Sequence, residues 1–415
     1  MIRIEKIIPG GQALGTNEDG KKIFFWNALP GETVKEFQIT KNKSHYAEAI
    51  ATTIENQSQY RIEPKDQCYL STSPWQIIKY DYELKLKQEL VVELFREHQI
   101  SLPAPPIITD NNDYFYRNKM EYALYWDNDI NKICLAFHAR SSHRKVPVTK
   151  SSIERPEIFS AATKIIQDLN KKHAEARDYQ SLLLRCNQNG EISGGLYENG
   201  QPHPSFKNLT DTILGHTYSY SPNGFFQINL PVYEMALTEI KKHIVTDQVL
   251  DLYSGVGTIG LSTAPDKHLT LVECDKSAFK ELEKNVAKMI QFESIRDNGS
   301  ERRSEPCNDG SERGGSRSES LSDIVTVLDK SENILGNIQS GQTVILDPPR
   351  AGCDGKLIER ILEVMPQKII YLSCNPATQA RDVKALLSKY HIEEAKTFNF
   401  FPHTPHIENL IVLSL

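Results

Sequence analysis

Cys374 is the residue of this sequence with the clearest capacity for chemistry, because a thiolate can act as a nucleophile. It follows the apolar run at 368–372 and precedes Asn-Pro, a pattern typical of a buried parallel strand that ends in a turn. Open α/β sheets bind ligands beyond the carboxyl ends of their strands, so we expect Cys374 at a ligand site. An isolated cysteine is more often a small buried hydrophobe, so other motifs must support the chemical interpretation.

A glycine-rich loop follows an earlier apolar strand and opens an expected helix. Residues 251–260 contain Gly255, Gly257 and Gly260 at the spacing of a dinucleotide fingerprint, and Glu273 ends the next strand. Glycines there let a ligand approach the backbone, and the acid binds ribose hydroxyls. Nicotinamide dinucleotides and S-adenosylmethionine both carry a ribose, so the loop alone indicates either ligand.

Two further motifs bring carboxylates and a histidine to strand ends. Asp347-Pro-Pro-Arg350 ends a third apolar strand and resembles motifs of S-adenosylmethionine-dependent methyltransferases that act on bases; an ordinary turn is the alternative. Residues 402–408, Pro-His-Thr-Pro-His-Ile-Glu, contain His406 and Glu408 after the last expected helix. A lone glutamate near a C-terminus is normally a solvated charge, but beside a cysteine nucleophile Glu408 could be a general base.

A fourth motif, Phe-Phe-Gln-Ile-Asn at 225–229, precedes the glycine loop. The alternation of polar and apolar residues predicts an edge strand. In such a strand Gln227 and Asn229 would lie on the same face.

Together these motifs resemble the RNA uracil-5-methyltransferase family. The resemblance rests on Phe-x-Gln-x-Asn, the glycine loop, Asp-Pro-Pro-Arg, Ser-Cys-Asn-Pro at 373–376 and Pro-His-x-x-His-x-Glu, in that order. Ala-Leu-Pro-Gly-Glu at 28–32 and Tyr-Arg-Asn-Lys at 116–119 are also similar to family patterns. The resemblance therefore covers nearly the whole chain.

The resemblance implies transfer of a methyl group from S-adenosylmethionine to C5 of a uridine in structured RNA. Cys374 would form a covalent adduct with C6 of the uracil, and Glu408 would remove the C5 proton. The remaining expected roles are cofactor binding by Gln227, Tyr253, Gly255, Gly257, Glu273 and Asp347, and substrate binding by Gln227, Asp347, Arg350 and His406.

The fold class expected is α/β, with a Rossmann-like class I methyltransferase domain and two N-terminal domains. Short strands with turn signals over 1–58 indicate a small OB-like β-barrel, which resembles the family's TRAM RNA-binding module. Residues 59–215 are expected to form a central mixed α+β RNA-binding domain, with a helix over 75–99 that could pack on the catalytic domain.

Residues 216–415 are expected to form the methyltransferase domain, because strands and helices alternate there. Its strands are predicted at 249–253, 269–273, 344–347 and 368–372. One stretch, 296–322, is rich in Ser, Glu, Arg and Gly and has little to bury. We expect it to be a disordered surface insertion in which Cys307 is inert.

Composition limits the class of protein. The chain has 415 residues, 39% hydrophobic and 25% charged, with a net charge of −6 and seven scattered cysteines. It lacks an apolar stretch of the roughly 18 residues that cross a bilayer, and its first residues lack a signal-peptide core. We expect a cytoplasmic monomer with reduced thiols that binds RNA and no membrane.

The sequence departs from the family pattern at one site. Many members carry a four-cysteine iron–sulfur site, whereas here Cys68 stands alone and Ser151 occupies a later ligand position. A cubane cluster needs four ligands, so we expect neither a cluster nor another metal.

Several alternatives stay open at this stage. An RNA cytosine-5-methyltransferase would also use a cysteine adduct, a nicotinamide-dependent oxidoreductase would use the glycine loop, and an inactive RNA-binding protein would need neither Cys374 nor Glu408. Within the family, the barrel favours 23S ribosomal RNA as the target, and a transfer RNA T-loop uridine is the alternative.

Overall fold

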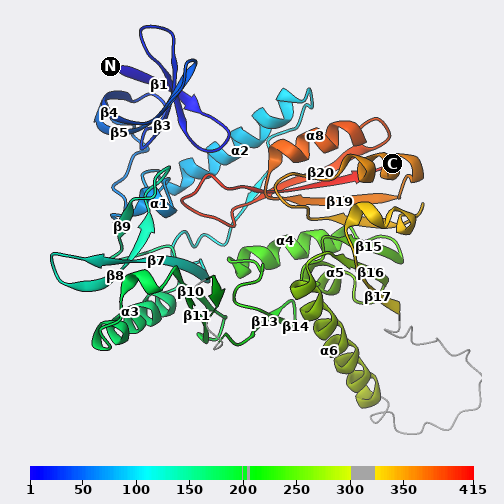
Figure 1. Ribbon diagram of the computed structural model, residues 1–415. Coiled ribbons are helices and arrows are strands. Elements are labelled where there is room, and N and C mark those ends of the chain that lie inside the picture. Colours follow the sequence, from blue (N-terminus) through cyan, green and yellow to red (C-terminus); the bar gives the residue numbers. More distant parts are fainter. Residues whose placement is uncertain (199, 203–205, 301–322) are drawn as a thin grey trace, which may run out of the picture.

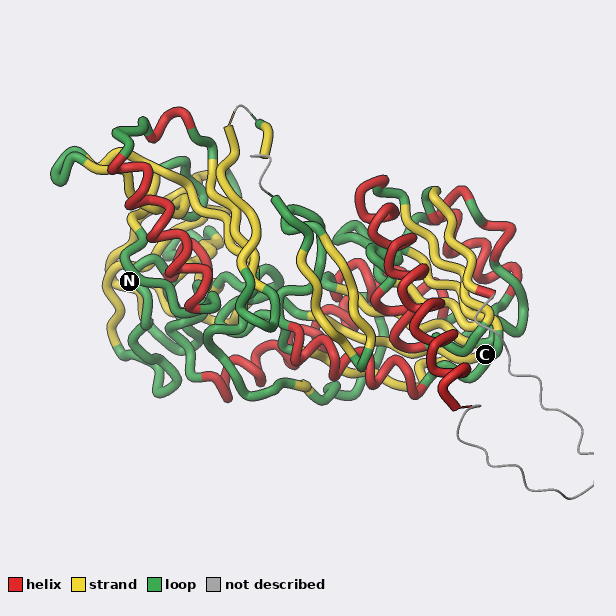
Figure 2. The backbone as a smooth tube through the Cα atoms, turned by 90° about the horizontal axis from the view of Figure 1, so that it is seen from below, coloured by secondary structure: helices red, strands yellow, loops and turns green. Residues whose placement is uncertain are grey.

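The computed structural model describes residues 1–198, 200–202, 206–300 and 323–415. A small barrel at the N-terminus, a central antiparallel sheet and a larger sheet layered with helices follow one another along the chain (Figure 1). Seen from below, the central sheet and the larger sheet lie at opposite ends of an elongated body (Figure 2).

The N-terminal strands close into a barrel in the order β1-β2-β3-β5-β4. Buried residues alternate along the strands, and the small side chains Ala47, Ala49 and Ala51 fill its narrow interior. The barrel expected over 1–58 is confirmed, whereas its assignment as a TRAM module stays a prediction. The strands are β1 (Ile2–Ile7), β2 (Ala13–Thr16), β3 (Lys22–Trp26), β4 (Thr33–Asn42) and β5 (Tyr46–Glu55).

Helix α2 (Tyr80–Glu97) connects the barrel to the larger sheet. Its buried residues Leu90 and Val91 share one apolar core with Val383 of α8 (Pro376–Leu386). The helix begins later than the predicted residue 75, because the preceding residues form a turn after the short α1 (Tyr69–Thr72), in which Ile78 bridges to Arg61.

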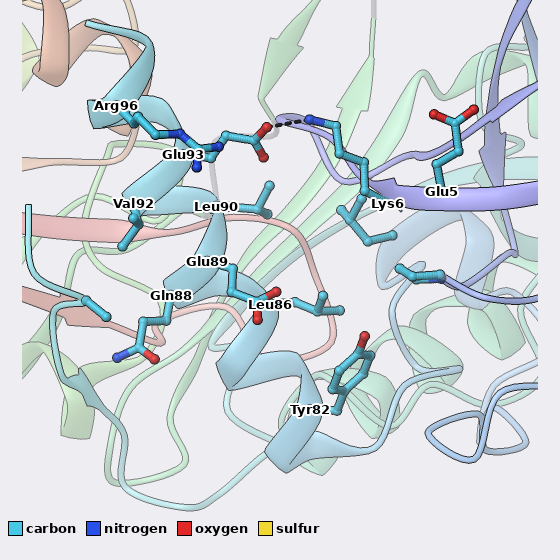
Figure 3. Close-up of a pocket in the computed structure, with 13 residues that line it drawn as sticks. Glu5, Lys6, Tyr82, Leu86, Gln88, Glu89, Leu90, Val92, Glu93 and Arg96 are labelled. Carbon is cyan, nitrogen blue, oxygen red and sulfur yellow. Dashed lines mark hydrogen bonds and ion pairs between the residues drawn. The ribbon is translucent and has the colours of Figure 1, made fainter. Parts of the chain in front are cut away.

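A cavity of about 560 Å³ separates β1 from α2 (Figure 3). Lys6 of β1 forms an ion pair with Glu93 of α2 at its edge. None of the predicted site residues lines this cavity, so it lies apart from the expected chemistry.

The central domain is an antiparallel sheet in the order β12-β11-β10-β7-β8-β9. Helix α3 (Pro156–Lys171) packs on it through the buried residues Ile158, Ala162, Ile166 and Leu169. The strands are β7 (Lys119–Asp127), β8 (Lys132–His138), β9 (Lys145–Pro147), β10 (Ser181–Cys186), β11 (Ile192–Glu198) and β12 (Gln201–Pro202), and a 3-10 turn spans Ala176–Asp178.

A hairpin of β13 (Leu209–Ile213) and β14 (His216–Tyr220) links the central and larger sheets. Leu209 and Tyr218 are buried in the core of the larger sheet. The domain boundary predicted between 215 and 216 therefore falls inside this hairpin, whose two strands pack together with the C-terminal part of the chain.

The larger sheet has the order β17-β16-β15-β18-β19-β21-β20-β6, with five parallel strands from β17 to β19. Successive strand residues face opposite cores, so Val344 and Leu346 pack on one side and Ile345 on the other. The four predicted strands are confirmed. The strands are β6 (Ile107–Ile108), β15 (Gln248–Leu252), β16 (His268–Glu273), β17 (Ile324–Leu328), β18 (Thr343–Leu346), β19 (Lys368–Ser373), β20 (His391–Phe398) and β21 (Glu408–Ser414).

Helices cover both faces of this sheet, as expected for a doubly wound fold (Figure 1). The helices besides α8 are α4 (Leu230–Lys242), α5 (Thr258–Thr263), α6 (Lys276–Ser300) and α7 (Gly355–Val364), with 3-10 turns at Ser331–Asn333 and Leu335–Asn337. The predicted insertion over 296–322 overlaps the end of α6, which extends to Ser300. The rest of the predicted insertion, with Cys307, lies outside the described residues.

Among the helices in the described ranges, none is both long enough and apolar enough to span a membrane.

Candidate active site

A cavity of about 870 Å³ opens at the carboxyl ends of β15, β16, β18 and β19. Nine of the ten predicted site residues line it: Gln227, Tyr253, Gly255, Glu273, Asp347, Arg350, Cys374, His406 and Glu408. The exception is Gly257, which is discussed below. The sequence motifs therefore converge on one cavity, where parallel strands of an α/β sheet end.

Cys374 and Glu408 meet because β21 runs antiparallel beside β19. Ser373 pairs with Asn409, so the residue that follows Ser373 and the residue that precedes Asn409 lie opposite one another. Both side chains line the cavity. Sequence reasoning put Glu408 after the last helix but gave no sign that its strand inserts between β19 and β20.

Three acidic groups of the cavity, Asp347, Cys374 and Glu408, have raised pKa values, which favour their protonated forms. Burial, together with Glu408 and Asp347, raises the pKa of the Cys374 thiol to about 11. Burial raises the pKa of Asp347 to about 7 and, with the charge of Asp347, raises that of Glu408 well above its ordinary value. Arg350 opposes the shifts of Cys374 and Glu408, so it is the cation that favours ionisation in this cavity.

Arg350 and His406 form a second polar group on the cavity wall. Nη2 of Arg350 lies 3.3 Å from Nδ1 of His406. Burial and the charge of Arg350 lower the pKa of His406 to about 4, so the imidazole is neutral at physiological pH. A neutral ring that accepts at Nδ1 carries its proton on Nε2, which is then a hydrogen-bond donor. The Arg350 carbonyl accepts a 2.8 Å hydrogen bond from Asn375.

The glycines of the loop have different tasks. Gly255 has a φ of +58°, and a Cβ there would meet open space, so a ligand can approach its backbone. The Glu273 carboxylate accepts a 2.8 Å hydrogen bond from the Gly255 amide, which keeps the acid beside the loop. Gly257 and Gly260 instead permit close packing: a Cβ would lie 2.5 Å from Leu282 at the first and 2.6 Å from Leu271 at the second.

Gly257 therefore does not line the cavity, although it was predicted to contact the cofactor. With a φ of +89° it caps α5, and its amide donates to the Ser254 carbonyl. Asp251, below the loop, accepts a 2.9 Å hydrogen bond from the Gly260 amide, and burial raises its pKa to about 8. The loop and Glu273 have the donors, acceptors and open backbone that a nucleoside ribose requires.

The segment 225–229 is irregular, so the predicted edge strand is wrong. Gln227 lines the cavity, whereas Asn229 is buried and donates to the Phe400 carbonyl, so the two amides do not share a face. The reason is that side chains of the central domain, rather than a strand, satisfy the carbonyls of this segment.

Three residues of the central domain make these hydrogen bonds. Lys119 donates to the Asn223 and Gly224 carbonyls at 3.1 Å each, and Asn118 donates to Gln227 at 3.1 Å. Arg185 is fully buried beside the stacked rings of Tyr220 and Phe226 and donates to the Phe226 and Gln227 carbonyls at 2.5 and 3.1 Å. The central domain therefore holds one wall of the cavity.

Sequence reasoning noted Asn118 and Lys119 as part of a basic and aromatic, family-like motif, and it missed Arg185. It also missed Asp329, which lines the cavity. Strand β17 carries Asp329 to the sheet edge and follows the Ser- and Arg-rich stretch, where no strand was predicted. A search for an acid after every apolar strand could have found it.

Cys68 does not line this cavity, and its surroundings indicate a structural role. Its sulfur is 3.8 Å from the Lys150 carbonyl, and burial raises the pKa of the thiol to about 12. Asp66 nearby accepts hydrogen bonds from Gln76 and Ser152. The described part of the chain contains no group of three His, Cys, Asp or Glu residues arranged for a metal ion. The absence of an iron–sulfur cluster stays a prediction.

The doubly wound sheet, the glycine loop and the cavity at the strand ends form an α/β fold that is consistent with class I methyltransferases. The sequence profile of the tRNA (uracil-5-)methyltransferase family matches residues 316–415. The resemblance to the RNA uracil-5-methyltransferase family, first drawn from the motifs, is thus confirmed.

Full-length relatives and a solved structure agree with this family. An uncharacterized RNA methyltransferase of Enterococcus faecalis is 28% identical and aligns over 100% of this chain and 97% of its own length. One from Staphylococcus aureus strain MSSA476 is 26% identical over 95% of this chain and 93% of its own. The Pyrococcus abyssi tRNA (uracil-54, C5)-methyltransferase in complex with S-adenosyl-L-homocysteine has the same fold, with a TM-score of 0.73, 20% identity and full coverage of both chains.

Proposed function

We propose that this protein transfers a methyl group from S-adenosylmethionine to C5 of a uridine in structured RNA. The observation that carries the proposal is the juxtaposition of Cys374 and Glu408 on adjacent antiparallel strands, in the same cavity as Asp347 and Arg350. Methylation of an unreactive uracil carbon requires a nucleophile that adds to the ring and a base that removes a proton from the same ring.

The cavity fits the cofactor. Gly255 offers open backbone, Glu273 faces the position of a ribose, and Gln227, Tyr253 and Asp347 complete the walls. When bound, S-adenosylmethionine supplies an electrophilic methyl group on a positively charged sulfur. A cation next to Asp347, Cys374 and Glu408 favours their ionised forms, against the burial that raises their pKa values.

Cys374 makes and breaks the covalent bond to the substrate. Its thiolate adds to C6 of the uracil, and the electron pair of the C5–C6 double bond moves toward C5 and O4, which makes C5 nucleophilic. After methylation at C5, the Glu408 carboxylate removes the C5 proton. The double bond re-forms, the Cys374–C6 bond breaks, and the thiolate leaves; the proton then passes from Glu408 to solvent.

The cavity supplies polar groups for the edge of the uracil ring. The Arg350 guanidinium and Nε2–H of His406 can donate to carbonyl oxygens, and Asp347 can accept from N3–H in its ionised form. A protonated Asp347 could instead donate to N3 of cytosine, so cytosine C5 is the second candidate substrate. A base paired in folded RNA must first be flipped out of its stack to reach Cys374.

The RNA target is proposed as large-subunit ribosomal RNA on the strength of the N-terminal barrel. The tRNA (uracil-54, C5)-methyltransferase of Pyrococcus abyssi, whose chain matches this one over its full length, supports the alternative, a uridine of transfer RNA.

Methyl transfer from labelled S-adenosylmethionine to unmodified transfer RNA and to large-subunit ribosomal RNA, in separate reactions, tests the proposal. We expect label as 5-methyluridine after digestion to nucleosides, from one of the two RNAs. Label in 5-methylcytidine would favour the second candidate. No label in either RNA, from protein that binds S-adenosylmethionine, would contradict the proposed function.

A further inference from the structure

A second cavity, of about 390 Å³, lies behind the wall that the central domain holds. Asn112, Phe115, Asn118, Arg155, Gln188 and Ile228 are among the residues that line it. Its volume is within the range of pockets that bind small organic groups. Neither the family resemblance nor the methyl-transfer chemistry assigns a task to this cavity.

The two cavities share a thin partition. Gln227 lines the catalytic cavity, and the next residue, Ile228, lines the second one. Asn118 fixes the partition from the central domain, since its side chain donates to the Gln227 carbonyl at 3.1 Å and its backbone amide donates to the Ile228 carbonyl at 3.2 Å. A strand of RNA with one base in the catalytic cavity therefore has a neighbouring base within reach of the second.

Phe115 is the strongest sign that this cavity binds a ligand. Its side chain is 51% exposed, and its backbone has a φ of +57°, a left-handed conformation that a bulky side chain rarely adopts. Hydrogen bonds on either side, from Phe115 to Ser152 and from Arg117 to Ile153, at 2.9 Å each, hold that backbone. The fold thus keeps an aromatic ring at the surface in a conformation that costs free energy, which is typical of functional sites.

The chemistry of the lining fits an unpaired nucleobase. Single-stranded RNA is recognised by aromatic rings that stack on bases and by amide and guanidinium groups that bond to base edges. Phe115 supplies the ring, and Asn112 and Gln188 supply amides at the exposed rim. Arg155 is fixed by hydrogen bonds to the Asn187 carbonyl at 2.7 Å and to the Glu157 carboxylate at 2.8 Å, so its guanidinium is held in one orientation.

We propose that the cavity beside Phe115 binds an unpaired base that flanks the target nucleotide in the RNA strand. The inference rests on the proposed function in one respect, that the substrate is RNA. It goes further in assigning a second base-binding site and a stacking residue outside the catalytic cavity.

Phe115→Leu tests the proposal, because leucine keeps an apolar side chain but cannot stack. The probe is whichever unmodified RNA the wild-type protein methylates. We expect KM for that RNA to rise about tenfold, in line with the loss of one stacked base, with kcat at saturating RNA and the affinity for S-adenosylmethionine unchanged. Phe115→Trp should restore the wild-type KM. Trp126→Leu is the matched control, since Trp126 is a similarly exposed aromatic of the central domain that lines neither cavity.

A fluorescent 2-aminopurine next to the target nucleotide gives a direct readout. Its emission should change on binding to wild-type protein and to Trp126→Leu, but not to Phe115→Leu. An unchanged KM in Phe115→Leu would overturn the proposal. A raised KM accompanied by losses of S-adenosylmethionine affinity and of thermal stability in that variant would also overturn it, because the substitution would then have disturbed the fold as a whole. If the wild-type protein methylates neither RNA, the proposed reaction fails separately. The affinity of both variants for single-stranded oligouridylate then tests whether the second cavity binds a base. Weaker binding in Phe115→Leu than in Trp126→Leu would support the proposal, and equal binding would refute it.

Discussion

Two polar clusters include residues of the chain segment 399–408, and they differ in how their charges are balanced. The first, which we call the paired cluster, comprises Glu83, Lys87, Asp113, Asn399 and His403. The second, the cavity triad, comprises Asp347, Cys374 and Glu408. In the first the buried carboxylate of Glu83 has the cation of Lys87 as its partner, whereas the second brings three acidic groups into one cavity.

The paired cluster fixes the backbone of the segment. Lys87 and Glu83, whose side chains are almost fully buried, lie 2.8 Å apart, and Lys87 also donates to Asn399 at 2.6 Å and to the Phe401 carbonyl at 3.0 Å. The Glu83 carboxylate accepts from the backbone amide of His403 at 2.9 Å. Balanced buried charges of this kind define a conformation because each needs its partner.

In the cavity triad, Arg350 is the cation that opposes the shifts of Cys374 and Glu408, and burial raises the pKa of all three members. Perturbed acids that converge in a cavity are typical of sites that move protons. Burial alone therefore does not distinguish a polar cluster with a structural role from one with a chemical role in this protein. The sign of the neighbouring charges does.

Substitutions in the cavity triad should have the largest effect, and it should be on activity. Cys374→Ala is expected to reduce methyl transfer below detection, because the covalent adduct cannot form. Glu408→Gln should reduce kcat about 10²- to 10⁴-fold, the range of a lost general base. It should also accumulate a protein–RNA adduct that survives denaturation, and adding Cys374→Ala should abolish that adduct. Adduct-free, fully active Cys374→Ala would refute the covalent mechanism.

Substitution in the paired cluster should mainly affect stability. Lys87→Met leaves Glu83 buried without its cation, and we expect the free energy of unfolding to fall by about 3–5 kcal/mol. Urea unfolding measures the change. Lys85→Met on the same helix is the control, because the Lys85–Glu89 pair is exposed and contributes little. The double variant Glu83→Gln with Lys87→Met should recover most of the loss, and no recovery would mean that the two residues act separately.

Asp347→Asn should lower methyl-transfer activity but raise stability, and the gain in stability should depend on pH. The pKa of Asp347 is raised to about 7 in the folded protein, so the folded state binds the proton more tightly than the unfolded chain, and stability falls as pH rises toward 7. Asparagine cannot ionise, so the variant should be more stable than wild type at pH 8, by about 1–3 kcal/mol, with a smaller gain at pH 5. Methyl transfer should fall.

Asp329→Asn is the opposite control for this prediction. Hydrogen bonds from Asn333 and from the Lys330 amide hold the pKa of Asp329 below its ordinary value, so ionisation stabilises the folded state there. Its substitution should therefore not raise stability at pH 8. Equal pH profiles for the two variants would contradict the charge assignment of the triad.

The site could largely be predicted from sequence because its motifs are local. Each predicted strand carries its chemistry at its carboxyl end, and apolar runs mark those ends clearly. The pairing of β21 with β19, which brings Glu408 to Cys374, could not be predicted, because long-range antiparallel insertion leaves no local periodicity. For the same reason, the alternation at 225–229 was taken for a strand. Arg185 supplies partners for that segment from a distant part of the chain.

The reactivity of Cys374 in the free protein tests the same contrast in the absence of substrate. With a pKa of about 11, the thiol is a small fraction thiolate at pH 7, so the rate of alkylation by iodoacetamide should rise about tenfold per pH unit from pH 7 to 10. Mass spectrometry of the Cys374 peptide measures this rate, with the exposed Cys274 of the same protein as an internal reference.

Alkylation at pH 8 also reports the charge of each neighbour. Asp347 is mostly ionised at that pH, so Asp347→Asn should speed the reaction several-fold, and Arg350→Gln should slow it, because a cation stabilises the thiolate. Glu408→Gln reports the protonation state of Glu408, whose pKa burial raises: the rate changes little where that carboxyl is protonated in the free protein. A marked acceleration in Glu408→Gln would mean that Glu408 is already ionised. The proton acceptor would then be ready before substrate binds, and the contrast with the paired cluster would rest on Asp347 and Cys374 alone.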